Sequence, residues 1–361
     1  MQAIADTWAA APPPVWDSGD DDLLVCRQVR QETHDVRTFV FSPARPGSFR
    51  FTPGQFLTFT FEIDGQPVSR CYTISSSPTR PDRATITVKR VPGGPVSNWL
   101  HDTLRPGDTV RALGPLGSFS CFAHPATKCL FISGGSGLTP LMSMARAYYD
   151  LGEDCDIAFV HNARTPADLV FRDELSTMAR HLPRFRFAPI CETDAANEAW
   201  PGYRGRISLP LLRLIAPDFA EREIFTCGPS PYMAAVRGLL TDAGFDMAHY
   251  HEESFVFAEL LAEEAAEPVF LADQAAFQVS FARSNCTVAC EADTMILAAA
   301  RRAGLKLPSS CTKGICGTCK STLVSGSVDM KHGGGIRQRE IDRGQILICC
   351  SKPLTDLVID R

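Results

Sequence analysis

Residues 309–319 read SSCTKGICGTC, which places three cysteines in a C-x4-C-x2-C spacing at Cys311, Cys316 and Cys319. Two adjacent cysteines, Cys349 and Cys350, follow near the end of the chain. The two glycines inside the loop allow its backbone to turn tightly. Three thiols in one tight loop, with a fourth from a distant segment, are arranged to surround one small inorganic centre.

This spacing is that of plant-type ferredoxins, in which four cysteine thiolates hold a 2Fe–2S cluster. The glycines also let backbone N–H groups approach the sulfides. A structural zinc site is the alternative, but zinc sites favour paired C-x2-C knuckles rather than one loop and a distant cysteine. We expect the fourth ligand to lie on a strand. Because successive strand side chains point to opposite faces, only one of Cys349 and Cys350 is expected to bind iron.

The bulk properties indicate a cytoplasmic protein of two or three domains. The chain has 361 residues, and 45% of them are hydrophobic, as in ordinary globular proteins. Its apolar runs are too short to span a membrane, and its first residues lack the build of a secretory signal. The 14 cysteines are scattered outside the loop. Thiolate ligands and many free thiols imply a reducing compartment.

The charge is uneven along the chain. The first 22 residues carry five Asp and no Lys or Arg, whereas residues 274–361 carry 12 Lys and Arg against 7 Asp and Glu. A basic domain is one sign of nucleic-acid binding, but the chain has no long basic run and no interleaving of basic and aromatic residues. We therefore expect no nucleic-acid or membrane partner. The favoured interpretation is a docking patch for an acidic protein.

The pattern of the chain divides it into five segments. Residues 1–22 are predicted to be a flexible tail. Residues 23–123 alternate short β-rich runs with Pro- and Gly-containing turns and one helix near 96–104, which predicts an antiparallel barrel. Residues 124–252 alternate strands and helices, which predicts a doubly wound parallel sheet that binds nucleotides at the carboxyl ends of its strands. Residues 253–273 are predicted to be a linker, and residues 274–361 carry the cysteine loop.

The barrel segment carries groups suited to a flavin. Residues 70–73 read RCYT, so Arg70 can pair with phosphates, Tyr72 can face the ring, and Thr73 can reach the ring nitrogen that accepts hydride. Residues 93–100 read GGPVSNWL, a glycine turn that opens a helix whose N–H groups can hold a pyrophosphate. The other candidate flavin residues are Val88, Lys89, Gly94, Val96 and Ser97.

The next segment carries glycine turns suited to a dinucleotide. Residues 131–140 read FISGGSGLTP, a strand, turn and helix start that lets a dinucleotide approach the backbone. The run is not the G-x-G-x-x-G fingerprint, so a generic glycine turn is the alternative. Residues 225–233 read FTCGPSPYM, and Cys227 there can lie beside a nicotinamide. The candidate residues of these two runs are Gly134, Gly135, Gly137, Thr139, Pro140, Cys227, Gly228, Pro229 and Met233.

The segment HNARTP at residues 161–166 bears on the choice of coenzyme. It follows the second predicted strand of the nucleotide domain, so His161 and Arg164 are further candidates for nucleotide binding. Arg164 can pair with a 2′-phosphate, but it can equally be a solvated loop arginine, which is the favoured interpretation.

The order of these motifs resembles the ferredoxin–NADP reductase superfamily. Together with the C-terminal cysteine loop, it makes residues 23–361 similar to the reductase components of bacterial Rieske-type oxygenases. The runs MKHGGGI at 330–336 and CCSKP at 349–353 look most like reductases of glycine betaine demethylase and related quaternary-amine monooxygenases. Reductases of hybrid-cluster proteins are also similar there.

The resemblance implies a fold, a ligand set and two catalytic residues. The fold is an antiparallel β-barrel flavin domain, an α/β doubly wound nucleotide domain and a C-terminal α+β plant-type ferredoxin (β-grasp) domain. The resemblance favours Cys349 as the fourth iron ligand. It implies that Thr73 orients the flavin and Cys227 the nicotinamide. It also places Glu252 and Phe255 near the flavin, although a plain linker start is the alternative reading of that segment.

The resemblance further implies an electron-transfer enzyme. Phthalate-type reductases share the domain order but use FMN, whereas GGPVSNWL resembles the FAD branch; we therefore expect FAD, and NADH rather than NADPH. Electrons are expected to pass from NADH through FAD and the 2Fe–2S cluster to a separate Rieske-type oxygenase. The alternatives are a reductase of a hybrid-cluster protein and, from a different class, a redox-sensing regulator. A regulator predicts a recognisable partner-binding or nucleic-acid module, and the sequence contains none.

Overall fold

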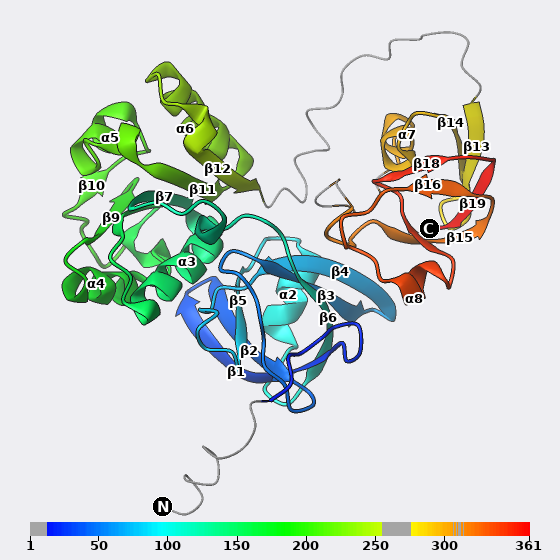
Figure 1. Cartoon of the computed structure of the whole chain (residues 1–361), viewed down its shortest axis with the longest axis horizontal. Helices are drawn as coiled ribbons and strands as arrows, with labels where there is room; N and C mark the ends of the chain where they lie inside the picture. Colours follow the sequence, from blue (N-terminus) through cyan, green and yellow to red (C-terminus); the bar gives the residue numbers. More distant parts are fainter. Residues whose placement is uncertain (1–12, 255–275, 306, 308, 310–311, 313) are drawn as a thin grey trace, which may run out of the picture.

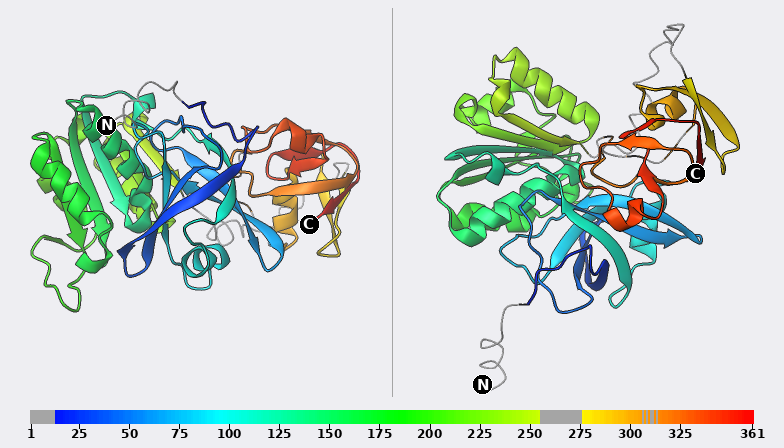
Figure 2. Two further views of the ribbon diagram at one scale, coloured as in Figure 1. Left: turned by 90° about the horizontal axis from the view of Figure 1, so that it is seen from below. Right: turned by 45° about the vertical axis from the view of Figure 1, so that its right-hand side comes forward.

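The computed structural model describes residues 13–254, 276–305, 307, 309, 312 and 314–361. These residues form three bodies, and the first body lies between the other two (Figures 1 and 2). Phe255, Cys311 and most of the predicted linker lie outside the described residues.

The first body is a six-stranded antiparallel sheet in the order β4-β3-β6-β1-β2-β5. An isolated bridge between Ile74 and Ile86 joins the end of β4 to β5 and closes the sheet into a barrel. Phenylalanines of the strands fill its interior, and Trp99 of helix α2 packs on Phe61 with ring centroids 5.4 Å apart. The elements are β1 (Leu23–Thr33), β2 (Val36–Pro43), β3 (Phe56–Ile63), β4 (Gln66–Thr73), β5 (Ala84–Lys89), α2 (Pro95–Asp102) and β6 (Thr109–Leu116).

The expectation of a flexible tail is wrong for residues 13–22. Val15 pairs with Ser48, and the Trp16 side chain is only 6% exposed. The Trp16 ring meets Phe49 edge to face, with centroids 5.3 Å apart. This apolar anchor binds the segment to the barrel, so burial of one aromatic ring overrides the polar, Pro-rich composition that predicted a tail.

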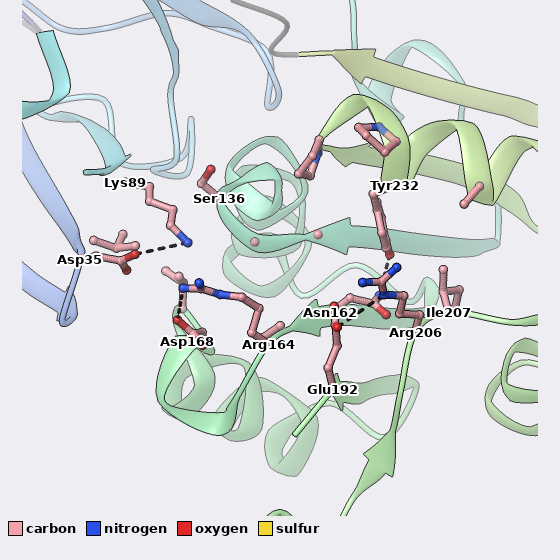
Figure 3. A pocket seen from close by; sticks show the side chains of 18 of the residues that line it. Asp35, Lys89, Ser136, Asn162, Arg164, Asp168, Glu192, Arg206, Ile207 and Tyr232 are labelled. Carbon is pink, nitrogen blue, oxygen red and sulfur yellow. Dashed lines mark hydrogen bonds and ion pairs between the residues drawn. The ribbon is translucent and has the colours of Figure 1, made fainter. Parts of the chain in front are cut away.

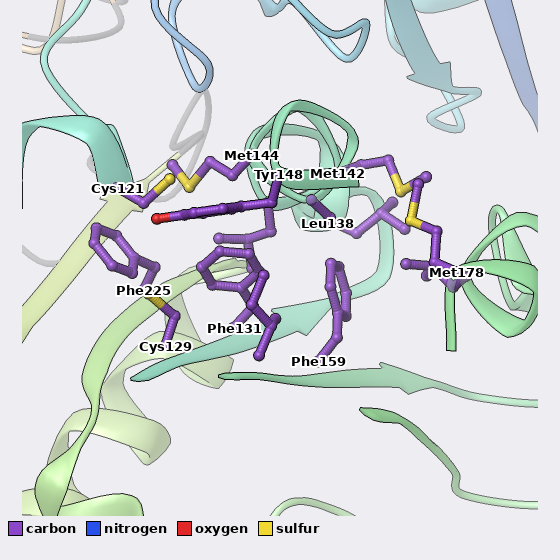
Figure 4. Close-up of a cluster of buried hydrophobic side chains, with 14 of the residues drawn as sticks. Cys121, Cys129, Phe131, Leu138, Met142, Met144, Tyr148, Phe159, Met178 and Phe225 are labelled. Carbon is purple, nitrogen blue, oxygen red and sulfur yellow. The ribbon is translucent and has the colours of Figure 1, made fainter. Parts of the chain in front are cut away.

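The second body is a parallel sheet with helices on both faces, in the order β10-β9-β8-β7-β11-β12. Helices α3 and α4 cover one face, and α5 and α6 cover the other, each over its own apolar cluster. Figure 4 shows the first cluster, in which the strand residues Phe131 and Phe159 meet Leu138 and Met142 of α3. The sequence did not predict β12, which pairs with β11 at the edge.

The strands of this sheet are β7 (Lys128–Gly134), β8 (Asp156–Ala163), β9 (Phe185–Cys191), β10 (Tyr203–Arg204), β11 (Glu223–Gly228) and β12 (Tyr250–Ser254). Its helices are α3 (Leu138–Leu151), α4 (Arg172–His181), α5 (Leu209–Ile215) and α6 (Ser230–Asp242). The glycine turn after β7 and the turn after β11 lie side by side, because these two strands are neighbours in the sheet.

The third body is a mixed sheet in the order β14-β13-β19-β15-β17, with a two-stranded ribbon of β16 and β18. Helix α7 packs its apolar face on this sheet, with Ile296 and Ala300 fully buried. The elements are β13 (Ala276–Phe281), β14 (Cys286–Glu291), α7 (Ile296–Arg302), β15 (Lys320–Ser325), β16 (Val328–Met330), α8 (Gln338–Ile341), β17 (Gln345–Leu347), β18 (Ser351–Pro353) and β19 (Leu357–Asp360).

The buried Trp16 gives a stability test of the N-terminal segment. We expect Trp16→Ala to lower the free energy of unfolding of the barrel by about 3–5 kcal/mol, because it removes a buried ring and leaves a cavity. Val15→Ala is the matched control, since Val15 is 55% exposed and its truncation should change stability by less than about 0.5 kcal/mol. Denaturant unfolding, monitored by hydrogen exchange of the barrel strands, measures the stability of both variants. Equal stability of the two variants would contradict the anchoring role.

Candidate functional site

Strand β4 ends in the predicted flavin motif, and one of its groups lacks a partner. Thr73 is 4% exposed, and its Oγ1 atom is buried without a hydrogen-bond partner. Burial raises the pKa of Tyr72 well above its ordinary value, so this phenol stays neutral. Leaving a buried hydroxyl unpaired costs about 1–3 kcal/mol, so the Thr73 position suits a polar ligand edge. The motif therefore fits a flavin ring.

The start of helix α2 is a closed glycine turn. Ser97 Oγ accepts from Val91 N at 3.1 Å and donates to the Gly94 carbonyl at 3.3 Å. A Cβ on Gly94 would lie 2.8 Å from Ser97 Oγ, so a larger residue there would displace the Ser97 side chain from the turn. Val96 is buried in the barrel core, which makes it a support for the turn rather than part of an exposed surface. The backbone N–H groups at the helix start remain suited to a phosphate group.

A cleft of about 500 Å³ lies between the barrel and the nucleotide sheet (Figure 3). Its barrel side includes Lys89, whose Nζ lies 3.3 Å from Asp35 Oδ2. Its sheet side follows the carboxyl ends of β7, β8, β9 and β11, where doubly wound sheets bind nucleotides. The predicted site residues that line it are Lys89, Gly134, Gly135, Arg164 and Pro229.

The glycine turn after β7 allows two chain segments to approach closely. A Cβ on Gly137 would lie 2.5 Å from the carbonyl oxygen of Cys227. A Cβ on Gly134 would meet the ring of Tyr232 at 3.0 Å. The turn after β7 and the turn after β11 thus form one cradle, and this cradle fits the backbone-lined site that a pyrophosphate needs. Thr139 and Pro140 are buried behind the cradle at the start of α3.

Several cleft residues were not among the predicted site residues. Tyr232 and Asn162 are hydrogen-bonded across the cleft floor, with Asn162 Nδ2 2.6 Å from the Tyr232 hydroxyl. Glu192 and Arg206 line the far end and form an ion pair at 3.4 Å. Glu192 directly follows β9, so the rule that ligands bind at strand ends was the signal that could have found it.

Arg164 is already paired within the protein. Its Nη2 atom donates to Asp168 Oδ1 at 3.1 Å. Burial opposes ionisation of Asp168, but the hydrogen bond from Thr165 and the charge of Arg164 hold the pKa of Asp168 below its ordinary value. Asp168 therefore stays ionised and holds the guanidinium. An incoming 2′-phosphate would have to compete with this carboxylate.

Four predicted cofactor-binding residues are buried and do not line the cleft. His161 is fully buried, its Nδ1 lies 2.8 Å from Ser133 Oγ, and burial lowers its pKa to about 4. Met233 is 3% exposed, and Val88 lies under the barrel surface. Cys227 is fully buried, and desolvation raises the pKa of its thiol well above the ordinary value. The Cys227 side chain is thus a neutral packing surface.

Glu252, which the resemblance places near the flavin, is followed by Glu253, which has a buried carboxyl oxygen. Glu252 accepts from Arg237 and from the Tyr250 hydroxyl, on a partly exposed face of β12. Glu253 pairs with Cys227 in the β11–β12 register, and its Oε2 atom is buried without a hydrogen-bond partner. Burial raises the pKa of Glu253 to about 8. Strand alternation was the missing signal, because neighbouring residues of β12 point to opposite faces.

The described part of the cysteine loop forms a tight cradle. Cys316, Cys319, Cys349 and Cys350 are each at most 6% exposed. A Cβ on Gly314 would lie 2.6 Å from Cys350 Sγ, and one on Gly317 would lie 2.7 Å from the Gly335 carbonyl. Buried thiols within a backbone cradle fit an iron–sulfur cluster.

The expected position of the fourth ligand on a strand is wrong. Cys349 and Cys350 lie in the turn between β17 and β18, where Cys350 N donates to the Leu347 carbonyl at 3.1 Å. Alternation along a strand therefore cannot choose between them, and both thiols are buried in the same apolar cluster. Cys349 remains the ligand predicted from the resemblance, and Cys311 lies outside the described residues.

Comparison with protein families supports the division into three parts. Residues 24–121 match the family described as an oxidoreductase FAD-binding domain, and residues 131–238 match an oxidoreductase NAD-binding domain. Residues 280–354 match a 2Fe-2S iron-sulfur cluster binding domain. The three matches fall on the barrel, the parallel sheet and the mixed sheet in turn.

Curated relatives and a solved structure match over almost the whole chain. The chain is 50% identical to the glycine betaine monooxygenase reductase subunit of Pseudomonas aeruginosa, over 94% of each chain. It is 42% identical to the stachydrine N-demethylase reductase subunit of Rhizobium meliloti, over 94% of this chain and 97% of the relative. The structure of phthalate dioxygenase reductase matches 96% of this chain and all of that chain, with a TM-score of 0.58 and 24% identity, which shows a common fold.

The buried Glu253 predicts a pH dependence of stability. An unfolded glutamate has a pKa of about 4.3, and the folded value is about 8. Between these values the folded protein retains a proton that the unfolded chain has lost, so rising pH destabilises the fold until about pH 8. Glu253→Gln removes this effect, so we expect its unfolding temperature to exceed that of the wild type by a margin that grows from pH 5 to pH 8. The margin should reach at least about 2–4 °C, which corresponds to about 1 kcal/mol.

Glu252→Gln is the control for this measurement, because it removes the neighbouring carboxylate on the opposite face of β12. The difference between its unfolding temperature and that of the wild type should not grow from pH 5 to pH 8. Parallel curves for Glu253→Gln and the wild type between pH 5 and pH 8 would mean that the Glu253 carboxyl is ionised in the folded protein.

Proposed function

The chain belongs to the family of three-domain oxidoreductases that join an FAD-binding, an NAD-binding and a 2Fe–2S domain, and we propose that it is the reductase subunit of a monooxygenase that demethylates glycine betaine or a related quaternary amine. The observation that carries this proposal is the 50% identity with glycine betaine monooxygenase reductase subunits over 94% of the chain. The stachydrine N-demethylase reductase subunit supports the broader class of N-demethylating systems.

The bound groups supply the redox chemistry: NADH delivers two electrons, and the flavin and the 2Fe–2S cluster pass them on singly to the oxygenase. The protein holds these groups in order and keeps water from them. In our proposal Thr73 offers its unpartnered hydroxyl to the flavin edge. The neutral Cys227 and Glu253 lie opposite each other on β11 and β12, and we propose that they pack behind the nicotinamide end without lining the cleft. Because the pKa values of both groups are raised, both stay neutral, and they place no fixed negative charge beside the electrons that NADH delivers.

The cleft supports NADH as the electron donor. Arg164 is bound by Asp168, and the carboxylate of Glu192 lines the same cleft. A carboxylate accepts hydrogen bonds from ribose hydroxyls, whereas it repels a 2′-phosphate. We therefore infer that Glu192 faces the ribose next to the adenine of the coenzyme.

The partner is proposed to be a separate oxygenase with an acidic docking face. Residues 274–361 carry a net charge of +5 before a cluster is counted, from 12 Lys and Arg against 7 Asp and Glu. Complementary charge speeds the encounter of two proteins. The 13 described cysteines that form no disulfide are consistent with the reducing cytoplasm. No helix in the described part of the chain is long and apolar enough to cross a membrane.

Anaerobic stopped-flow mixing of the holoprotein with NADH tests the proposal. We expect rapid bleaching of the flavin band and then of the cluster band, with slower reduction by NADPH. Reduced protein mixed with a glycine betaine monooxygenase oxygenase component and glycine betaine should then release formaldehyde, which an N-demethylation produces. Flavin reduction without cluster reduction would contradict the relay, and an intact relay without formaldehyde would contradict the substrate system.

The coenzyme assignment predicts the effect of one charge. Glu192→Gln should raise kcat/KM for NADPH about tenfold, or about 1.4 kcal/mol, because it removes the repulsion of the 2′-phosphate. Arg206→Gln is the matched control: it breaks the same ion pair but keeps the carboxylate, so NADPH should gain nothing. Steady-state kinetics with both coenzymes measures the change. An equal gain in the two variants would assign the effect to the ion pair rather than to the charge of Glu192.

A further inference from the structure

The two faces of strand β4 contact different parts of the protein. In the β3–β4 register Tyr72 is paired with Leu57, and Cys71 is paired with Thr58. Paired residues share a face of the sheet, and successive residues alternate between faces. Leu57 is fully buried, and Tyr72 packs against the barrel core. Cys71 and Thr58 therefore point out of the barrel on its other face.

The cysteine loop rests on this outer face. Thr58 Oγ1 donates a hydrogen bond to the carbonyl oxygen of Cys316 at 2.8 Å. Cys71 Sγ lies 3.6 Å from the same oxygen and 3.9 Å from Thr318 Oγ1. Thr58 is only 4% exposed although it points outward, because the loop covers it. One carbonyl of a predicted iron ligand is thus held by two neighbouring strand residues.

A second contact fixes the same orientation from the edge of the barrel. Arg337 donates to Asp22 Oδ2 at 3.2 Å and to the Ala112 carbonyl at 3.1 Å. Arg339 reaches the Gly19 carbonyl at 2.5 Å. Burial of Asp22 opposes its ionisation, but the hydrogen bonds from Arg337 and Arg111 hold its pKa below the ordinary value. The acidic N-terminal segment therefore pairs with the basic third body, and the views in Figures 1 and 2 agree that this body lies against β3, β4 and β6.

We propose that Thr58 and Cys71 are positioning residues for electron transfer, which seat the iron–sulfur loop on the outer face of the strand that carries the flavin motif. This inference rests on the proposed function. The step they serve moves one electron from the reduced flavin to the oxidised cluster and neither forms nor breaks a bond. Two such transfers, each followed by delivery to the oxygenase, pass on the two electrons that NADH supplies.

The arrangement explains why two uncharged side chains do this work. Electron transfer slows steeply as the gap between two redox groups widens, so a loop seated on β4 would keep a cluster held there close to a flavin held by the motif at the end of the same strand. A directed hydrogen bond to the Cys316 carbonyl fixes the loop without placing a charge beside the cluster. A loop held by its own backbone carbonyl keeps one geometry, which is the requirement for preorganised function.

The test uses the full-length holoprotein, and Thr58→Val and Cys71→Ala each remove one contact to the Cys316 carbonyl. Thr58→Val removes the hydroxyl at nearly constant volume, and Thr58→Ser restores a hydroxyl. Thr60→Val is the matched control, because Thr60 lies on the same face of β3 but bonds Ser69 within the barrel. Anaerobic stopped-flow with NADH reports flavin reduction and cluster reduction separately. We expect Thr58→Val to slow cluster reduction at least tenfold while flavin reduction is unchanged, with Thr58→Ser and Thr60→Val near the wild type.

A second readout is independent of turnover. Alkylation of Cys71 in the oxidised holoprotein, quantified by peptide mass spectrometry, should become several-fold faster in Thr58→Val and stay unchanged in Thr60→Val. A Thr58→Val protein that lost flavin or cluster absorbance would be replaced by Cys71→Ala, which removes the other contact to the same carbonyl and should slow cluster reduction.

The outcomes separate the two claims. A wild-type protein whose cluster is not reduced through its flavin would overturn the proposed function and this inference together. In a second outcome the wild-type cluster is reduced through the flavin, and both Thr58→Val and Cys71→Ala reduce the cluster at the wild-type rate. If Cys71 alkylation in Thr58→Val is also unchanged, this inference alone is overturned.

Discussion

The alternation of side chains along strand β4 is the constraint on which the seating of the third body on the barrel depends. Tyr72 faces the barrel core, and Cys71 faces outward to the iron–sulfur loop. A shift of register by one residue would exchange these faces, so Tyr72 would lose its contact with the core and Cys71 its contact with the loop. The Thr58–Cys71 pairing holds the register at the point where the third body touches the barrel.

Unpaired polar atoms in otherwise dry surroundings mark where ligands belong. The Thr73 hydroxyl and the Glu253 carboxyl each have a buried oxygen without a hydrogen-bond partner. Such atoms destabilise the fold unless a ligand or a proton satisfies them. Thr73 is the last residue of β4, and Glu253 lies next to the last residue of β12. The stability lost there is consistent with a protein whose bound groups complete its core.

The sequence was sufficient where the chemistry demands a fixed spacing. The C-x4-C-x2-C loop and the RCYT run predicted their domains, and the alternation of strands and helices predicted the parallel sheet. It was insufficient where the outcome depends on packing. Trp16 lies in a segment of polar and proline-rich composition, yet one buried ring attaches it to the barrel. Local composition does not report such distant contacts.

The same limit applies to single residues. Glu252 and Glu253 are adjacent and chemically alike, and only the pairing of β12 with β11 decides which of them is buried. Cys349 and Cys350 were assigned to a strand, whereas the chain turns between β17 and β18 there. No motif in the sequence marks Glu192 as a site residue. It lines the cleft because β9 ends there.

The most direct test of the account is a crystal structure of the holoprotein with anomalous scattering recorded at the iron edge. We predict iron peaks at the loop that covers Thr58 and Cys71, on the outer face of β4, with flavin density against Tyr72 and Thr73. Iron peaks beside the nucleotide sheet, or away from the barrel, would contradict the claim that one strand joins the flavin site to the cluster.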